Sequence, residues 1–180
     1  MKVAVYFATG YEEIEALAVV DVLRRGNIET LMVGVDGKMV VSARGIAIKM
    51  DTTIEELDED EIDMMVLPGG VPGIMNLEAN EKLISQLKSF KANHKYLAAI
   101  CAAPSILGKL GLLEGEKATC YPNYESQLMG CEHIDHPVVV SHKIITGKGA
   151  GVALDFALKI LEVLKDKETA DKIRKSMIAD

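Results

Sequence analysis

Ala98-Ala99-Ile100-Cys101-Ala102-Ala103-Pro104 leads from an apolar run, through one cysteine, to the start of a helix. The small residues Ala99 and Ala103 lie two positions before and after Cys101. Glycines hold these positions in the G-x-S-x-G nucleophile elbow, whose sharp turn has no room for bulk. Pro104 suits a first helical turn, because no helical hydrogen bond needs its missing N–H. The stretch therefore predicts a strand, a sharp turn that carries Cys101, and a helix.

Short apolar runs of the same kind recur along the chain and alternate with helical patterns. Such runs predict parallel strands covered on both faces, and they lie at residues 3–7, 30–34, 64–67, 96–100 and 144–146. Apolar residues spaced three and four apart predict helices at residues 13–25, 80–93, 151–165 and 167–178. Residues 40–41 and 46–49 predict a small hairpin beside the sheet. We expect an α/β doubly wound sandwich, with a mostly parallel sheet and helices on both faces.

The composition indicates a globular protein with a large core. The chain has 180 residues, of which 49% are hydrophobic, and a net charge of −7. Such an acidic chain is not expected to carry the basic face of a nucleic-acid binder, and no uncharged apolar run approaches the ~20 residues of a membrane span. No repeat or linker divides the sequence, so one domain is expected over residues 1–180. The first residues enter a strand without a cleavage pattern, which favours a cytoplasmic location over secretion.

The three cysteines, Cys101, Cys120 and Cys131, cannot all pair with one another. An odd number without closely spaced pairs indicates free thiols. A cysteine in an apolar run is commonly an inert buried side chain. Cys101, however, precedes a predicted helix, where the positive end of the helix dipole favours the thiolate. We therefore expect Cys101 to be a reactive nucleophile with a lowered pKa.

A carboxylate is expected beside Cys101, because the sites of open parallel sheets lie at the carboxyl ends of the strands. Glu12, Glu13 and Glu15 follow the first predicted strand and open a helix. The helix dipole alone explains Glu12 and Glu13. Glu15 instead shares its helix face with apolar residues, which predicts a carboxyl held at the rim and able to exchange protons.

Pro68-Gly69-Gly70 follows the third predicted strand at the same rim. The stretch is either a plain turn or a place where the backbone can approach a substrate closely. In the second case the N–H of Gly70 and that of Ala102 together form an oxyanion hole.

These stretches together resemble the ThiJ/PfpI superfamily, and most closely its branch of Parkinson-disease protein deglycases. The resemblance runs in order over nearly the whole chain. It is carried by residues 10–15, 21–26, 66–70, 98–104, 149–151 and 155–158. It implies a flavodoxin-like fold related to class I glutamine amidotransferases, no cofactor, and a homodimer.

The resemblance also assigns roles to residues. It implies that Cys101 is the nucleophile, that Glu15 is its hydrogen-bonding carboxyl partner, and that Gly70 and Ala102 supply the oxyanion-hole amides. It places Arg44 near the site and the dimer contact. Members of this branch are glyoxalases, deglycases of methylglyoxal- and glyoxal-derived adducts, and redox-responsive chaperones.

Three positions depart from the family pattern. Tyr121, in Cys120-Tyr121-Pro122, stands where the branch often has a histidine, so Tyr121 is a candidate substrate contact. The peptidase-type members have a histidine directly after the cysteine, whereas this chain has Ala102, which disfavours peptidase activity. Lys148-Gly149-Ala150-Gly151 replaces an Arg-Gly-Pro-Gly loop and removes a bidentate guanidinium.

A metal site is the alternative function of Cys131-Glu132-His133-Ile134-Asp135-His136. This spacing offers two or three ligands, with His142 or Cys120 as a fourth. Structural zinc sites normally combine two closely spaced pairs, and this segment has the pattern of an exposed loop, so no metal is expected.

The sequence therefore predicts a cofactor-independent cysteine enzyme of the glyoxalase or deglycase type, a hydrolase or lyase that acts on small carbonyl compounds or glycated adducts. A redox-responsive chaperone or sensor that uses the same thiol is the alternative, since thiolate character also governs oxidation. A scaffold with a vestigial site is the third reading.

Overall fold

A computed structural model describes residues 1–179 and has a seven-stranded sheet at its centre. The strand order is β10-β11-β7-β6-β1-β2-β5. Every neighbouring pair is parallel except β10 with β11. The strands are β1 (Lys2–Phe7), β2 (Glu29–Gly34), β5 (Thr52–Thr53), β6 (Met64–Leu67), β7 (Tyr96–Ile100), β10 (Val138–Ser141) and β11 (Ile144–Gly147).

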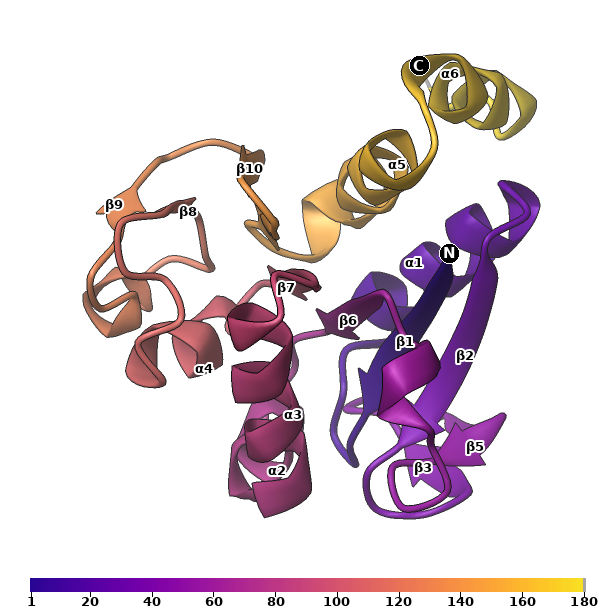
Figure 1. Cartoon of the computed structure of the whole chain (residues 1–180). Coiled ribbons are helices and arrows are strands. Elements are labelled where there is room, and N and C mark those ends of the chain that lie inside the picture. The colour runs from indigo at the N-terminus through magenta and orange to yellow at the C-terminus, as the bar shows by residue number, and fades with distance from the viewer. Residues whose placement is uncertain (180) are drawn as a thin grey trace.

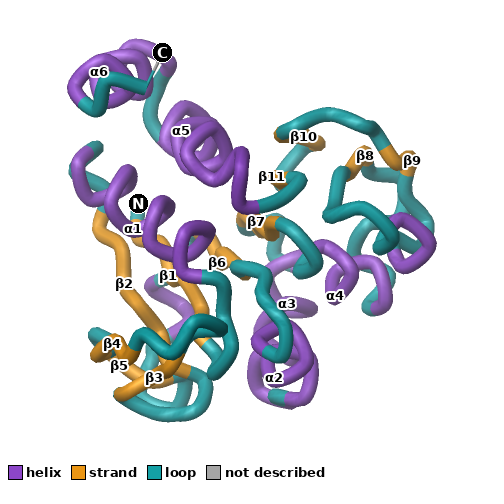
Figure 2. Tube along the Cα trace, turned by 180° about the vertical axis from the view of Figure 1, so that it is seen from behind, coloured by secondary structure: helices purple, strands orange, loops and turns teal. Residues whose placement is uncertain are grey.

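Helices cover both faces of this sheet (Figure 1). One face is covered by α1 (Glu13–Arg25), α5 (Ala153–Leu164) and α6 (Lys167–Ser176). The other face is covered by α2 (Gly73–Ala79), α3 (Glu81–Ala92) and α4 (Pro104–Lys109). Seen from behind, α1 and α5 lie side by side, and α6 follows α5 (Figure 2). The predicted doubly wound α/β sandwich is confirmed.

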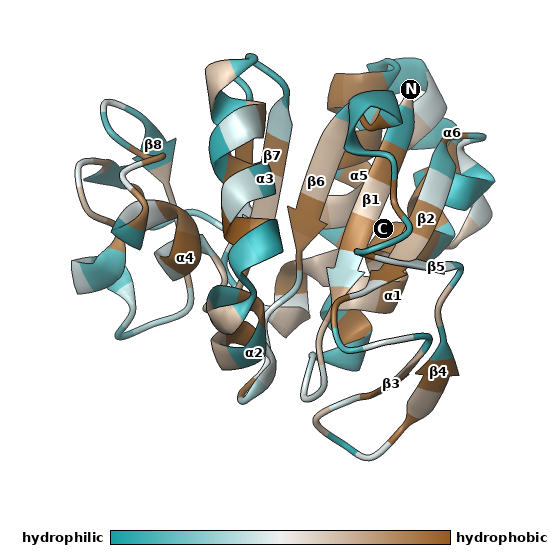
Figure 3. Cartoon of the chain, turned by 60° about the horizontal axis from the view of Figure 1, so that its bottom comes forward, coloured by the Kyte–Doolittle hydropathy of each residue, from teal (hydrophilic) through white to brown (hydrophobic). Residues whose placement is uncertain are grey.

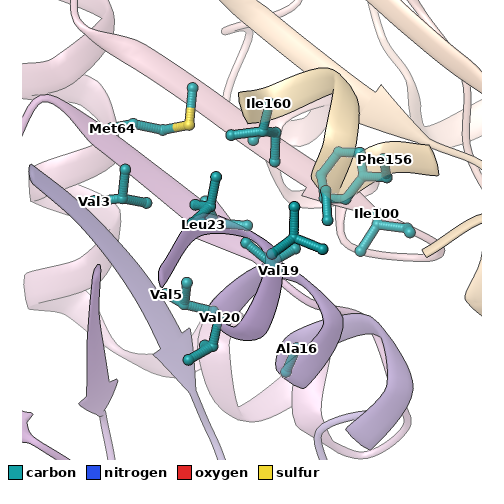
Figure 4. Close-up of a cluster of buried hydrophobic side chains, with 14 of the residues drawn as sticks. Val3, Val5, Ala16, Val19, Val20, Leu23, Met64, Ile100, Phe156 and Ile160 are labelled. Atoms are coloured by element: carbon teal, nitrogen blue, oxygen red, sulfur yellow. The ribbon is translucent and has the colours of Figure 1, made fainter. Parts of the chain in front are cut away.

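The core consists of two apolar layers, one on each side of the sheet. Val3, Val5 and Phe7 of β1 point into one layer, and Ala4 and Tyr6 point into the other, as the two-residue period of a strand requires. Side chains of α1 and α5 pack together in the first layer, which holds Val19 and Leu23 of α1, Phe156 and Ile160 of α5, and Val3 of β1 (Figure 4). Hydrophobic colouring is concentrated on the central strands β1 and β6, whereas α3 is hydrophilic on part of its surface (Figure 3).

All five predicted strands and the hairpin, β3 (Met39–Val41) with β4 (Ala47–Lys49), are present. The predicted helix at residues 80–93 is α3, and that at 151–165 is the short 3-10 turn Ala150–Val152 followed by α5. The sequence patterns did not predict α2, β5, β10 and a short parallel pair, β8 (Lys117–Ala118) with β9 (Glu132–His133). β5, β8 and β9 have two residues each and α2 is about two turns long, too short for a period to stand out. β10 is as long as β6 and β11, so its short apolar run did contain the signal of a strand.

The topology places the ends of three strands together. The chain passes from β1 outward to β2 and then returns to β6 on the other side of β1. Ligands of such sheets bind outside the carboxyl ends of the strands, where the order reverses. The segments after β1, β6 and β7 meet at this edge, which confirms the predicted common rim.

Helices capable of crossing a membrane are absent from residues 1–179: none is long and apolar enough.

The packing of α5 against α1 can be tested by a substitution at the contact. Leu161 is fully buried, and its methyl groups lie where a side chain on Gly26 would be. We expect Leu161→Ala to lower the free energy of unfolding by about 2–5 kcal/mol, because a cavity remains. Lys159→Ala, at a half-buried position of the same helix, should change it by less than about 1 kcal/mol, because the main loss is a surface ion pair with Glu162. Urea denaturation of both variants measures the difference, and equal stability would contradict the packing.

Candidate functional site

Cys101 lies directly after β7 in a strained backbone conformation. Its φ is +64°, which is uncommon for a residue with a side chain and typical of functional turns. Two hydrogen bonds fix the turn: the Cys101 N–H donates to the Gly147 carbonyl at 2.9 Å, and the Tyr121 N–H donates to the Cys101 carbonyl at 2.7 Å. The predicted strand–turn–helix elbow is therefore present, with α4 after it.

Glu15 approaches the same place from the first turn of α1. Its residue is only 1% exposed, and Glu12 caps the helix by accepting the Glu15 N–H at 2.8 Å. The Glu15 Oε2 accepts the N–H of Gly69 at 2.8 Å, while the buried Oε1 has no hydrogen-bond partner. One oxygen of the carboxyl is thus held in place, and the other is free to accept a proton.

Gly69 provides the space in which Glu15 and Cys101 meet. A Cβ on Gly69 would lie 2.7 Å from the Glu15 Oε2, 2.6 Å from the Cys101 Cβ and 3.1 Å from the Cys101 Sγ. Any side chain there would therefore collide with both groups. The sequence analysis gave a role only to Gly70, although a Gly-Gly pair after a strand is itself a signal of close approach.

The backbone N–H groups of Gly70 and Ala102 interact with the Cys101 thiol. Within residues 1–179 neither N–H donates to a backbone carbonyl. Gly70 has φ +98°, and a Cβ on it would lie 2.5 Å from the Glu12 nitrogen, so only glycine fits. The two amides that the sequence predicted as an oxyanion hole thus both face the sulfur.

The expected lowering of the Cys101 pKa is wrong. Burial, and next the charge of Glu15, raise the pKa of the Cys101 thiol to about 12, although the two amides act in the opposite direction. The helix that follows, α4, has only six residues, and a dipole contributes typically about 0.3–1 kcal/mol.

Burial also raises the pKa of Glu15 to about 7, even though the Cys101 thiol and the Gly69 N–H favour its charged form. The pair therefore loses its first proton near neutral pH. The second loss is far harder, because two negative charges would then share one buried site. A carboxyl poised near pH 7 is well matched to general base catalysis.

A pocket of about 320 Å³ opens onto this pair. All six predicted site residues line it, together with four that were not predicted. The predicted ones are Cys101, Glu15, Gly70, Ala102, Arg44 and Tyr121, and the others are Glu12, Val71, Tyr124 and Ala150. Tyr124 belongs to no sequence motif and reaches the pocket only through the fold.

The loop that carries Arg44 is anchored by Glu13. The Glu13 Oε1 accepts the Ser42 hydroxyl at 2.7 Å, and the Ala43 N–H donates to the Tyr11 carbonyl at 2.8 Å. Glu13 is buried and holds Ser42, so the interpretation that the helix dipole alone explains Glu13 is wrong. Its contact with Ser42, 29 residues away in sequence, is visible only once the hairpin packs on α1.

The remaining candidates lie outside this site. All three cysteines are free. Cys120 is buried in the apolar layer under α2, α3 and α4, and Cys131 packs against that layer. His133 and His136 are exposed. Across residues 1–179, no three His, Cys, Asp or Glu side chains are grouped so that they could hold a metal ion.

A cysteine at an elbow, a buried carboxyl and two neighbouring amides define a class of flavodoxin-like proteins with a cysteine site at the sheet edge. The DJ-1/PfpI family profile matches residues 1–163, so the chain belongs to this family. The chain is 36% identical over 177 residues to Protein dj-1beta of Drosophila melanogaster, covering 97% of this chain and 95% of that one. It is 33% identical over 168 residues to the glutathione-independent glyoxalase DJR-1.2 of Caenorhabditis elegans, covering 92% and 89%.

The chain also matches a longer relative and several solved structures. The chain matches DJ-1 homolog B of Arabidopsis thaliana at 35% identity over 179 residues but spans only 41% of that protein. Among solved structures, oxidized DJ-1 of Toxoplasma gondii superposes with a TM-score of 0.94 at 40% identity, covering 98% of this chain and 97% of that one. The flavodoxin-like fold expected from the resemblance is therefore confirmed.

The coupling of Glu15 and Cys101 predicts how the reactivity of the Cys101 thiol depends on pH. The rate of Cys101 alkylation should rise as pH increases through about 7, where Glu15 loses its proton, and then level off. In Glu15→Gln this base is lost while burial, the largest cause, still raises the Cys101 pKa, so the rate should show no rise near pH 7 and should increase only in alkaline solution. Iodoacetamide labelling followed by peptide mass spectrometry gives both profiles. The same profile in both proteins would contradict the coupling.

Proposed function

We propose that the protein is a cysteine-dependent, cofactor-independent enzyme that acts on small reactive carbonyl compounds or their adducts, as a glyoxalase or deglycase. The observation that carries the proposal is the thiol of Cys101 between two free amides, with the buried carboxyl of Glu15 beside it. The relative named as a glutathione-independent glyoxalase supports the same chemistry.

In the first step, the sulfur of Cys101 adds to the aldehyde carbon of an α-oxoaldehyde. The S–C bond forms, the π electrons of the carbonyl move to its oxygen, and the thiol proton passes to Glu15. The N–H groups of Gly70 and Ala102 are positioned to stabilise the resulting oxyanion. Because the Glu15 pKa lies near 7, the carboxyl can accept this proton and later return it.

In the following steps, a proton moves from the former aldehyde carbon to the neighbouring carbon. The first carbon is thereby oxidised and the second reduced, which leaves a thioester on Cys101. Water then cleaves the thioester, releases the 2-hydroxy acid and restores the thiol. Glu15 is the group in the pocket best placed to carry the moving proton, and no external oxidant is required.

Lactate formation from methylglyoxal, without glutathione, tests this function. We expect turnover by the wild type and none above background in Cys101→Ala, since the nucleophile is gone. Glu15→Gln should lower kcat by about 100-fold, because proton transfer is lost. The control is Cys131→Ala, which changes a thiol outside the pocket and should keep wild-type activity. Equal turnover in the wild type and Cys101→Ala would contradict the proposal.

A redox-responsive role for the same thiol is the second candidate. The Toxoplasma gondii structure described as oxidized supports it, as does the pair of amides facing the sulfur, which can donate to the oxygens of an oxidised cysteine.

Peptide mass mapping after mild peroxide treatment tests the redox role. Cys101 should oxidise before Cys120, which is only 1% exposed, and before Cys131, and Glu15→Gln should slow the reaction of Cys101. Equal oxidation of the three thiols would exclude a redox role specific to Cys101.

A further inference from the structure

A second, shallow hollow adjoins the pocket of Cys101. It also measures about 320 Å³ and is lined by Tyr121, Pro122 and residues 148–152. Tyr121 and Ala150 line both spaces, so the two hollows share a wall. A molecule bound against Cys101 therefore has room to extend past Tyr121.

The ring of Tyr121 is the main part of this shared wall. The residue is 49% exposed, and its backbone N–H is fixed to the Cys101 carbonyl at 2.7 Å. A Cβ on Gly149 would lie 3.3 Å from the Tyr121 Cδ2 and 3.8 Å from its Cε2. The ring thus packs against the bare backbone of Gly149, which places an aromatic surface between the two hollows.

The second hollow is apolar although a lysine lines it. The ammonium group of Lys148 pairs with Asp135, so the alkyl stem of the lysine remains for the hollow. Two backbone N–H groups of the wall are already bound: that of Lys148 donates to the Pro137 carbonyl at 2.9 Å, and that of Val152 donates to the Gly149 carbonyl at 3.0 Å. The wall therefore offers an aromatic ring, a proline and small side chains, and the charge of its lysine is already paired.

We propose that this hollow is a specificity subsite, which takes an aromatic or branched alkyl substituent on the carbonyl compound that reacts at Cys101. The inference deepens the proposed function, because it names the substrate class as substituted rather than minimal α-oxo compounds. An apolar group in such a subsite gains hydrophobic contact in proportion to the area it buries, so an aryl or branched alkyl group gains more than the single methyl group of methylglyoxal. Tyr121 is thereby a specificity-determining residue.

Cys101 labelling with two haloketones tests the subsite without requiring turnover. The thiol displaces bromide from 2-bromoacetophenone or from bromoacetone: the S–C bond forms, the C–Br bond breaks, and the thiol proton goes to Glu15 or water. Each rate is divided by that of N-acetylcysteine, which removes intrinsic reactivity. We expect Cys101 to favour the aryl reagent about tenfold over this reference.

Gly151 offers a variant that blocks the hollow. A Cβ on Gly151 meets nothing within 4 Å, and its φ is outside the left-handed range, so a side chain there causes neither clash nor strain. Gly151→Leu should abolish the aryl preference, while the matched control Gly151→Ala should keep it. Thermal unfolding of both variants verifies that each is folded.

Three results decide the inference. An aryl preference that is lost in Gly151→Leu and kept in Gly151→Ala supports the subsite. A wild-type preference equal to that of N-acetylcysteine overturns it, and needs no variant. A preference that survives in Gly151→Leu also overturns it, because the aryl group then binds elsewhere. Methylglyoxal turnover measured in parallel separates the two proposals: its absence, with the preference intact, removes the enzyme function and leaves the binding subsite.

Discussion

The site depends on one close contact, in which Glu15 and Cys101 share the space that Gly69 leaves open. The carboxyl is held by the Gly69 N–H at 2.8 Å, and no side chain on Gly69 could avoid both partners. Burial disfavours the charged forms of both groups and raises the pKa of each. Above neutral pH the pair therefore keeps one proton and carries one negative charge. The sulfur is therefore not a permanently activated thiolate. It becomes a nucleophile when the neighbouring carboxyl takes its proton.

The sheet topology makes this contact possible. Glu15, Gly69 and Cys101 are far apart in sequence, and each follows a different strand of the parallel sheet. The reversal of strand order between β1 and β6 places those strand ends at one edge. Burial of α1 against α5 then fixes the direction of the Glu15 side chain, because the helix cannot rotate without exposing its apolar face. Core packing and the chemistry of the pair are thus parts of the same arrangement.

Much of this arrangement was predictable from the sequence. Continuous apolar runs identified five of the seven strands of the main sheet, and the small residues around Cys101 identified the elbow, since both are local patterns. The pKa of Cys101 was not predictable, because the helix dipole is a local property, whereas burial and the charge of Glu15 depend on residues distant in the chain. Tyr124 and the Glu13–Ser42 contact were missed for the same reason. The hollow beside Tyr121 likewise exists only once residues 121–122 and 148–152 pack together.

The most direct test of the account is the titration of Glu15 itself, followed by NMR of the protein labelled with ¹³C at glutamate carboxyl groups. We expect the Glu15 carboxyl signal to titrate with a midpoint near pH 7, well above the ordinary glutamate pKa of about 4.3. Its change should coincide with the rise in Cys101 alkylation. A midpoint at the ordinary value, or alkylation that rises at a pH where Glu15 does not titrate, would contradict the shared-proton pair.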